Sequence, residues 1–372
     1  MVSKYIVLLY VKIGKDDELC ERYELVDTLS RGGMGEVWVA EDKILGRKVA
    51  IKSINPSLLY SNPKAISIFR DEARIGANLL GHPNVVAILD YGIHKDGAQE
   101  EHFMVMEYIE GLNVSTFINN IKSKIDGDTY YYISLLIAWE ICRAIQYAHK
   151  QGILHRDIKP LNAFISKYGI VKVGDFGLAR FVDAITRTHT VGNFNSPPYA
   201  APEQWKGDEY EKNTDIYQLG CTLYHLFTGR LVFEKSKMAQ MYAHLNEEPQ
   251  PPIDFCSNMT EELSSIILEM LSKDIDDRAS LWKLNDILAK ELQRTFELNV
   301  SIDKNNDEVI DKVCTITDFP QEEFRGNGEY SFTFPDFNEV LSEGIELVLN
   351  DITSFTITAQ ETEKEKELQV SS

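Results

Sequence analysis

The residues best suited to chemistry lie in two short segments near the middle of the chain. Residues 155–162 read His-Arg-Asp-Ile-Lys-Pro-Leu-Asn, and residues 175–177 read Asp-Phe-Gly. Asp157 can accept the proton of a reacting hydroxyl, and Lys159 can neutralise a phosphoryl group in transfer. Asn162 and Asp175 offer oxygen ligands of the kind that Mg²⁺ binds. Because a structural loop has no need of this polar set, the spacing predicts a phosphoryl-transfer site.

A glycine-rich run lies far upstream, between two expected strands. Residues 30–37 read Ser-Arg-Gly-Gly-Met-Gly-Glu-Val. Glycine lets backbone N–H groups approach phosphate oxygens where a Cβ would intrude. Hairpins also contain glycine turns that bind nothing, so this run alone does not decide between the two. The flanking strands argue against a dinucleotide-binding turn, which leads from a strand into a helix, and favour a flap over a nucleotide.

A lysine at the end of an apolar strand is a third candidate. Lys52 closes the run Val-Ala-Ile-Lys at residues 49–52, and Glu72 follows on an expected helix. A strand-end lysine is commonly only solvated, but a carboxylate partner would hold it as a point charge for phosphate oxygens. Glu72 is either that partner or an exposed charge on the helix surface.

The elements that must position these residues change in kind along the chain. Period-two apolar patterns predict strands near 23–29, 37–40, 48–52, 85–89 and 103–108, with one helix over 68–79. Beyond Gly111 the period becomes helical. An apolar stripe predicts a helix over 133–148 that ends before Gly152, and others are expected at 215–229, 238–246, 260–272 and 280–294. The fold class is therefore α+β, with a small strand-rich part before a larger helical part.

Composition limits the partners and the surroundings. The 372 residues carry 38 Lys and Arg against 58 Asp and Glu, a net charge of −20, which argues against nucleic acid as a partner. The five cysteines contain no C-x-x-C pair, so neither a disulfide framework nor a zinc site is expected. No apolar run reaches the ~18 residues of a membrane span. A cytoplasmic protein is expected.

The order of the motifs resembles that of the eukaryotic-like Ser/Thr protein kinases, in their bacterial branch. From about Tyr23 to Gln293 the chain carries the glycine-rich run, Val-Ala-Ile-Lys, His-Arg-Asp-Ile-Lys-Pro-Leu-Asn, Asp-Phe-Gly and then Ala-Pro-Glu at 201–203. The resemblance implies a bilobal kinase fold. It also implies transfer of the γ-phosphoryl group of ATP, with Mg²⁺ or alternatively Mn²⁺, to Ser or Thr hydroxyls of protein substrates.

At matching positions the resemblance implies individual roles. Lys52 would hold the α/β-phosphates and pair with Glu72, Asp157 would be the catalytic base beside Lys159, and Asn162 and Asp175 would bind the metal. The implied nucleotide-site residues are Ser30, Gly32, Gly33, Gly35, Val37, Ala50, Lys52, Met106, Glu107, Ile109 and Phe164. Met106 would be the gatekeeper. Phe164, where a smaller aliphatic residue is usual, would narrow the pocket. Because one extra residue precedes His82, Asp71 stays an alternative to Glu72.

The resemblance also implies supporting contacts and a switch. Glu203 would pair with Arg278, and Asp215 would brace the catalytic-loop backbone. Arg156 would bind a phosphate on the loop from 178 to 200, where Thr186, Thr188 and Thr190 are the candidates for autophosphorylation. Ser196 would instead be held by Asp157 and Lys159.

The expected organisation has three parts. Residues 1–22 form an N-terminal extension and 23–296 the kinase domain, with an N-lobe at 23–110 and a C-lobe at 111–296. Residues 297–372 form an acidic extension of unknown partner, with 18 acidic and 5 basic residues and strand patterns near 330–334 and 354–358. A pseudokinase and a scaffold that acts through this extension are the rival functions, but the complete set of catalytic residues favours an enzyme.

Overall fold

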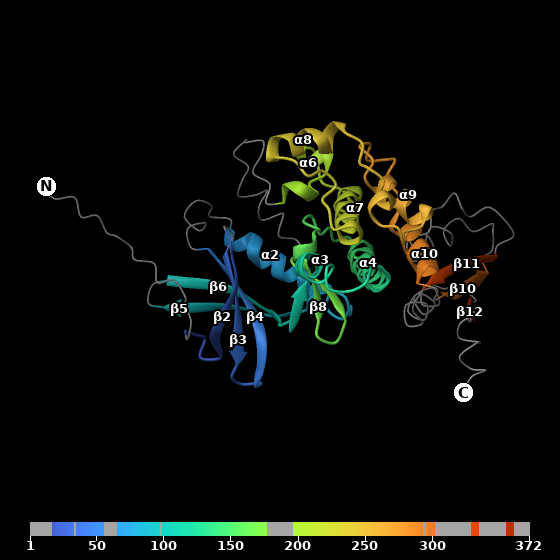
Figure 1. The fold of residues 1–372 in the computed structure, drawn as a ribbon. Helices are drawn as coiled ribbons and strands as arrows, with labels where there is room; N and C mark the ends of the chain where they lie inside the picture. The colour runs from blue at the N-terminus through green and yellow to red at the C-terminus, as the bar shows by residue number, and fades with distance from the viewer. Residues whose placement is uncertain are drawn as a thin grey trace.

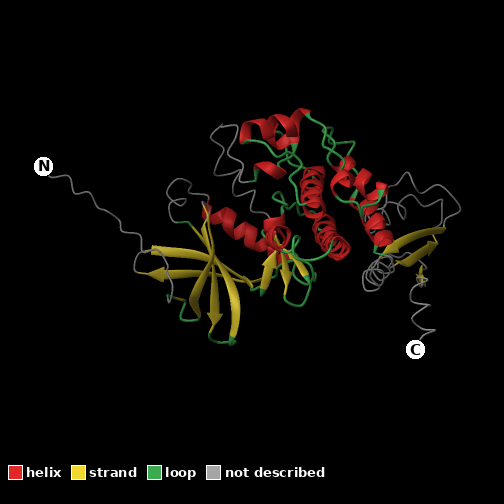
Figure 2. Ribbon diagram, viewed as in Figure 1, coloured by secondary structure: helices red, strands yellow, loops and turns green. Residues whose placement is uncertain are grey.

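The structure is a computed structural model that describes residues 17–32, 35–55, 65–96, 99–176, 196–292, 295–301, 329–334 and 355–360. It has an N-terminal lobe built on a sheet and a larger, mainly helical C-terminal lobe (Figures 1 and 2). The described residues contain no helix that is both long and apolar enough to cross a bilayer.

The N-lobe is a six-stranded antiparallel sheet with one helix packed on it. The sheet order is β1-β2-β3-β4-β6-β5. Its strands are β1 (Glu18–Leu19), β2 (Tyr23–Gly32), β3 (Gly35–Asp42), β4 (Arg47–Ile54), β5 (Ile88–Asp96) and β6 (Gln99–Glu107), and the helix is α2 (Ala65–Asn78). Strand β1 precedes Tyr23, so the sheet begins inside the expected N-terminal extension.

Alternation along β4 explains how the sheet packs on both faces. Val49 and Ile51 belong to one buried cluster with Trp38, whereas Ala50 belongs to another that contains Phe69 of α2. Because successive strand side chains point to opposite faces, Lys52 shares the α2 side with Ala50. The strand pattern therefore places the lysine beneath the helix.

One predicted strand boundary differs from the structure. The expected strand at 85–89 begins only at Ile88, and the hairpin then continues to Asp96. Val85 instead forms an isolated parallel bridge with Val173 of the C-lobe, and the flanking Asn84 and Val86 share backbone hydrogen bonds with the same residue. Val85 and Val86, whose apolar side chains extended the strand pattern, contact Val173 of the C-lobe and do not belong to β5.

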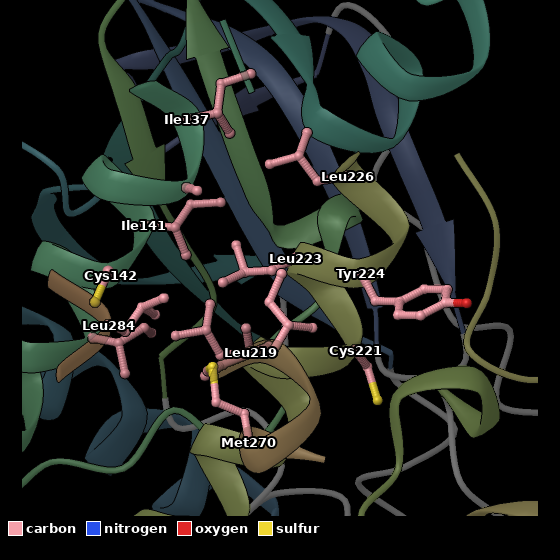
Figure 3. Close-up of a cluster of buried hydrophobic side chains, with 14 of the residues drawn as sticks. Ile137, Ile141, Cys142, Leu219, Cys221, Leu223, Tyr224, Leu226, Met270 and Leu284 are labelled. Atoms are coloured by element: carbon pink, nitrogen blue, oxygen red, sulfur yellow. The ribbon is translucent and has the colours of Figure 1, made fainter. Parts of the chain in front are cut away.

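The C-lobe packs its helices around one buried core. Its elements are β7 (Gly111–Asn113), α3 (Val114–Asn120), α4 (Gly127–Lys150), η1 (Pro160–Asn162), β8 (Ala163–Ser166), β9 (Val171–Val173), η2 (Pro197–Tyr199), α6 (Pro202–Lys206), α7 (Lys212–Thr228), α8 (Lys237–Asn246), η3 (Pro252–Phe255), α9 (Glu261–Met270) and α10 (Leu281–Glu291). Figure 3 shows Ile141 of α4, Leu219 and Leu223 of α7, Met270 of α9 and Leu284 of α10 in this core.

The ends of α4 follow from local sequence. The side chain of Asp126 accepts a hydrogen bond from the Thr129 N–H and caps the first turn. After the last turn, Gly152 has a φ of 70°, a left-handed conformation that glycine adopts without a steric penalty. The chain can therefore turn sharply from α4 into the segment that carries Asp157.

Three short strands form a separate sheet that begins two residues before the expected start of the extension. β10 (Thr295–Ser301) pairs antiparallel with both β11 (Glu329–Phe334) and β12 (Phe355–Gln360). The alternation near 330 and 354 predicted two of these strands, but β10 was not anticipated. Strand β11 lies beside α10 (Figure 1).

Candidate active site

Lys52 lies between two carboxylates from different lobes. Its Nζ is 3.3 Å from Glu72 Oε1 and 3.0 Å from Asp175 Oδ1. Helix α2 turns Phe69, Glu72, Ala73 and Gly76 inward, at the spacing that puts residues on one helix face. Asp71 is largely exposed and lies near Arg74. The helix geometry thus brings Glu72, and not Asp71, to the lysine.

Burial makes the charges of this cluster interdependent. It raises the pKa of Glu72 to about 7, although the Lys52 ammonium acts in the opposite direction. For Asp175 burial also acts to raise the pKa, but the nearby Lys52 outweighs it and the net shift is downward. Burial would lower the pKa of Lys52, but the carboxylates of Asp175 and Glu72 raise it. Asp175 therefore keeps its charge more readily than Glu72 does.

Asp157 lies in a short polar network at the start of η1. Lys159 Nζ donates to Asp157 Oδ2 and to Ser196 Oγ, both at 2.6 Å. Asn162 Nδ2 donates to the Asp157 carbonyl at 2.9 Å. The expected contact of Ser196 with Lys159 is present. The arrangement leaves a carboxylate and an ammonium side by side, which suits proton acceptance next to a developing negative charge.

The backbone of this loop is held by Asp215 of α7, as predicted. Asp215 is fully buried and accepts hydrogen bonds from the His155 N–H at 2.8 Å and the Arg156 N–H at 2.7 Å. His149 of α4 contacts the same carboxylate at 2.8 Å. Burial alone would raise the pKa of Asp215, but these partners lower it. The carboxylate supports Arg156, whose φ of 72° is unfavourable for a side-chain residue.

Sequence reasoning missed a second support from α7. Gln218 Oε1 accepts from the Ile158 N–H at 2.9 Å, and its Nε2 donates to the Arg156 carbonyl at 3.1 Å. Gln218 follows Asp215 by three residues, so the two share a helix face. That spacing was a usable signal for finding it.

The expected adenine wall lies where β3, β4 and β6 meet. Val37 packs against a buried cluster that contains Ala50 and Met106, and Ala50 is the cross-strand partner of Met106. At the start of β3 a Cβ on Gly35 would lie only 1.8 Å from the Ser53 carbonyl oxygen. Glycine is therefore required there by the close approach of β4.

The connection between the lobes is fixed by an ion pair that was not predicted. Glu107, the last residue of β6, has its Oε1 2.8 Å from Lys172 Nζ of β9. The same oxygen accepts from the Ala87 N–H at 2.7 Å. A lone lysine in a short strand carries no motif, so the sequence offered no signal for this contact. Ile109 follows in the half-buried connecting segment.

The remaining nucleotide-site predictions fall in different places. Ser30 and Gly32 lie at the end of β2, with Ser30 opposite Val37 and Gly32 opposite Gly35. Phe164 of β8 is half-buried and lies close to Gly174. Gly33, Thr186, Thr188 and Thr190 lie outside the described residues.

The donors near Asp175 suit a divalent cation held partly by a nucleotide. Because the amide nitrogen of Asn162 is used by Asp157, its amide oxygen is the atom left to bind a metal. In the described ranges, no group of three or more His, Cys, Asp or Glu side chains is arranged to hold a metal. Two protein oxygens completed by phosphates are typical of Mg²⁺ sites, so this donor set fits the predicted ion.

The supporting ion pair between Glu203 and Arg278 is also present. Arg278 Nη1 and Nη2 donate to the two carboxylate oxygens of Glu203 at 2.7 and 2.8 Å. A paired geometry of this kind is the strongest that the two side chains form. It joins α6 to the segment before α10.

Comparison with known proteins identifies relatives along most of the chain. A family model described as a protein kinase domain matches residues 23–292. A probable serine/threonine-protein kinase of Streptomyces coelicolor is 38% identical over 260 residues, which are 69% of this chain and 38% of that protein. The serine/threonine-protein kinase PknB of Mycobacterium leprae is 36% identical over 262 residues, covering 70% of this chain and 41% of that protein. The chain therefore spans about two fifths of these relatives.

Solved structures agree with the fold. The kinase domain of PknI from Mycobacterium tuberculosis matches with a TM-score of 0.58 at 21% identity, over 76% of this chain and all of that one. Its C20A mutant matches with a TM-score of 0.57 at 22% identity, over 75% of this chain and 99% of the other. At this identity the likeness speaks for the fold alone.

Proposed function

This chain belongs to the protein kinase family, and from that premise we propose that it transfers the γ-phosphoryl group of Mg-ATP to Ser or Thr hydroxyls of proteins. The observation that supports this most is the joint arrangement of Lys52, Glu72 and Asp175. A complete ion-pair cluster between the lobes is what a phosphate-positioning lysine requires. Asp157 and Lys159 supply the second half of the chemistry.

Each residue has a defined task in this mechanism. Asp157 orients the acceptor hydroxyl and takes its proton as the oxygen attacks phosphorus. Lys159, 2.6 Å from Asp157, stabilises the negative charge on the phosphoryl oxygens in the transition state. Lys52 fixes the phosphates that remain on the nucleotide, and Glu72 keeps Lys52 in place. Positioning and charge neutralisation account for the catalysis.

Asn162 and Asp175 would hold the divalent cation. When bound, the ion would neutralise phosphate charge, which the two protein ligands alone cannot do. The backbone of Asp175 is left-handed, with a φ of 63°, a strained conformation of the kind found at functional sites, which supports this proposal. The adenine base of ATP would lie against the wall of Val37, Ala50 and Met106.

The test is phosphate transfer by the purified chain. After incubation with Mg-ATP and a generic protein substrate, mass spectrometry is expected to find phosphoserine or phosphothreonine. Asp157→Asn should lower the rate by at least ~10²-fold, the typical effect of losing a positioned acid–base group, with an unchanged melting temperature. Tight nucleotide binding without any phosphate transfer by the parent would favour a pseudokinase instead.

We also propose that the chain activates itself by phosphorylation between Asp175 and Glu203. Arg156 has its guanidinium carbon 5.2 Å from the centre of the Tyr210 ring, a cation–π contact that a phosphate could replace with a stronger charged one. The acceptors would be Thr186, Thr188 or Thr190. Replacing all three by alanine should reduce activity while leaving ATP binding nearly unchanged. Equal activity of this triple variant and the parent would contradict the proposal.

A further inference from the structure

Gly174 leaves a space that the side chain of Phe164 uses. A Cβ added at Gly174 would lie 3.2 Å from Phe164 Cε2 and 3.2 Å from Val86 Cγ2. Favourable contacts between carbon atoms lie at ~3.5–4.0 Å. Any side chain at position 174 would therefore have to displace the Phe164 ring or Val86.

The glycine is not needed for its backbone conformation. Gly174 is absent from the glycines with positive φ in the described residues, so an alanine could adopt its backbone. The backbone is nevertheless fixed on both sides: its N–H donates to the Asn162 carbonyl at 2.9 Å, and its carbonyl lies 3.0 Å from His155 Nε2. Because Gly174 cannot shift away, an added methyl group would push on the Phe164 ring and on Val86.

The ring of Phe164 connects this space to the nucleotide site. Val86, which together with Phe164 borders the space beside Gly174, packs on the cluster of Ala50 and Met106 that forms the expected adenine wall. Phe164 also lies opposite Lys172 on the neighbouring strand, and Lys172 holds Glu107 at the lobe connection. A displaced Phe164 ring would therefore disturb the Val86 side of this wall and the strand that carries Lys172.

We propose that Gly174 is a specificity-determining residue of the nucleotide site, because its missing side chain seats the Phe164 ring and so sets the height available to the base. The proposal rests on the proposed function, which places a nucleotide against this wall. The large residue at 164 does not by itself narrow the site. Phe164 and Gly174 act as a matched pair: a side chain added at position 174 is tolerated only when the residue at position 164 is smaller than phenylalanine.

The test is a double-mutant cycle on the full chain, with Mg-ADP as the probe in titration calorimetry. Gly174→Ala should weaken ADP binding about tenfold, within the range of overpacking effects. Phe164→Leu should stay within about threefold of the parent, since the smaller side chain still lines the site. The combined variant should bind ADP within about threefold of Phe164→Leu, because the added methyl group then meets no ring.

Melting temperatures without nucleotide provide a second readout that does not depend on ADP. Gly174→Ala should lower the melting temperature when Phe164 is present and leave it nearly unchanged when Leu is at 164. Gly127→Ala is the matched control, because nothing lies within 4 Å of a Cβ added at Gly127. It should change neither readout.

The possible failures can be told apart. Equal loss from Gly174→Ala in both backgrounds would overturn the pairing, since the methyl group would then be acting through Val86 or Asp175 and not through the ring. No loss in either background would overturn it as well. A parent that binds no ADP would contradict the proposed function, and the melting temperatures would still decide whether Phe164 and Gly174 are paired.

Discussion

The ammonium of Lys52 links a carboxylate of the N-lobe to a carboxylate of the C-lobe. Its ammonium lies between Glu72 and Asp175 at nearly equal distances. If Glu72 loses its charge, the Asp175 carboxylate is the ionic partner left to the ammonium among the residues that the structure describes, and Asp175 is the proposed metal ligand. The ion pair between Lys52 and Glu72 therefore helps to keep the Asp175 carboxylate available for the metal.

A neutral substitution at Glu72 tests this balance. Glu72→Gln is expected to lower phosphate transfer by roughly 10-fold or more, because a buried charge-assisted contact is lost. Asp71→Asn is the matched control on the same helix. Its carboxylate is exposed and lies near Arg74, an arginine of the same helix that is also exposed, so activity should stay within about twofold. Steady-state kinetics of both variants decides, and a larger effect at Asp71 would contradict the assignment.

Residues in continuous motifs were predictable from local sequence, and isolated residues such as Asp215 and Arg278 were predictable only through the family resemblance. Asp157, Lys159 and Asn162 stand in one loop, where their types and spacing identify the chemistry. Lys172 and Gly174 carry no such signal, because their importance comes from Glu107 and Phe164, which reach them only through the fold. Single-residue tertiary contacts cannot be found from local sequence.

At the scale of elements, the β8–β9 hairpin fixes the lobe connection. Lys172 of β9 binds Glu107 in a half-buried pair at 2.8 Å. Lys167, at the end of the same hairpin, pairs with Glu110 at 2.6 Å, but both side chains are largely exposed. Solvent screens exposed pairs, which contribute little. The inner pair is therefore the one that should affect nucleotide binding.

Two substitutions separate these pairs. Lys172→Met should raise the KM for ATP about fivefold with little change in kcat, because Glu107 is left without its half-buried cation. Lys167→Met should leave the KM within about twofold. Initial-rate kinetics at varied ATP measures both, and Lys172→Arg should restore part of the loss. An equal response of the two methionine variants would rule out the distinction.

Element boundaries failed where a tertiary contact competed with local pattern. The strand expected from Val85 begins at Ile88, because the bridge to Val173 uses the preceding backbone. Helices were predicted more closely, since α7 ends at the left-handed Gly229 and α8 buries Gln240, Ala243 and His244 on one face. The third strand of the extension was missed because its partners lie more than 25 residues away in sequence.

At the scale of the whole molecule, the extension is expected to be separable from the catalytic chemistry. Helix α10 ends at Glu291, and Leu292 is the last described buried residue of the C-lobe. A chain that ends after Gln293 should fold and phosphorylate a generic substrate. Its melting temperature should fall by a few degrees, since β11 no longer covers α10. Insolubility or complete inactivity of this chain would place 297–372 in the catalytic core.

Acid should destabilise the molecule through His82, whose ring is partly buried. Burial and nearby cations lower the pKa of His82 to about 4, against ~6.5 in an unfolded chain. Between these values the unfolded state binds more protons, so the free energy of unfolding falls as the pH falls, by up to ~1.4 kcal/mol per unit. Urea unfolding at several pH values from 7 to 5 should show that the free energy of unfolding falls less steeply with falling pH in His82→Phe than in the parent. The phenylalanine keeps an aromatic ring against Tyr147. An unchanged slope would contradict this.

The hydrogen bonds between Asp215 of α7 and the catalytic loop should also slow amide hydrogen exchange in that loop. The amide protons of His155 and Arg156 are held by a fully buried carboxylate, although these residues lie in no helix or strand. Solvent deuterium can reach them only when α7 separates from the loop, which is an opening of the whole C-lobe core. In hydrogen–deuterium exchange, a peptide over 153–158 should therefore label as slowly as the middle of α4. Rapid labelling of that peptide would mean that the loop opens on its own, and slow labelling would make an irregular segment one of the most persistent parts of the molecule.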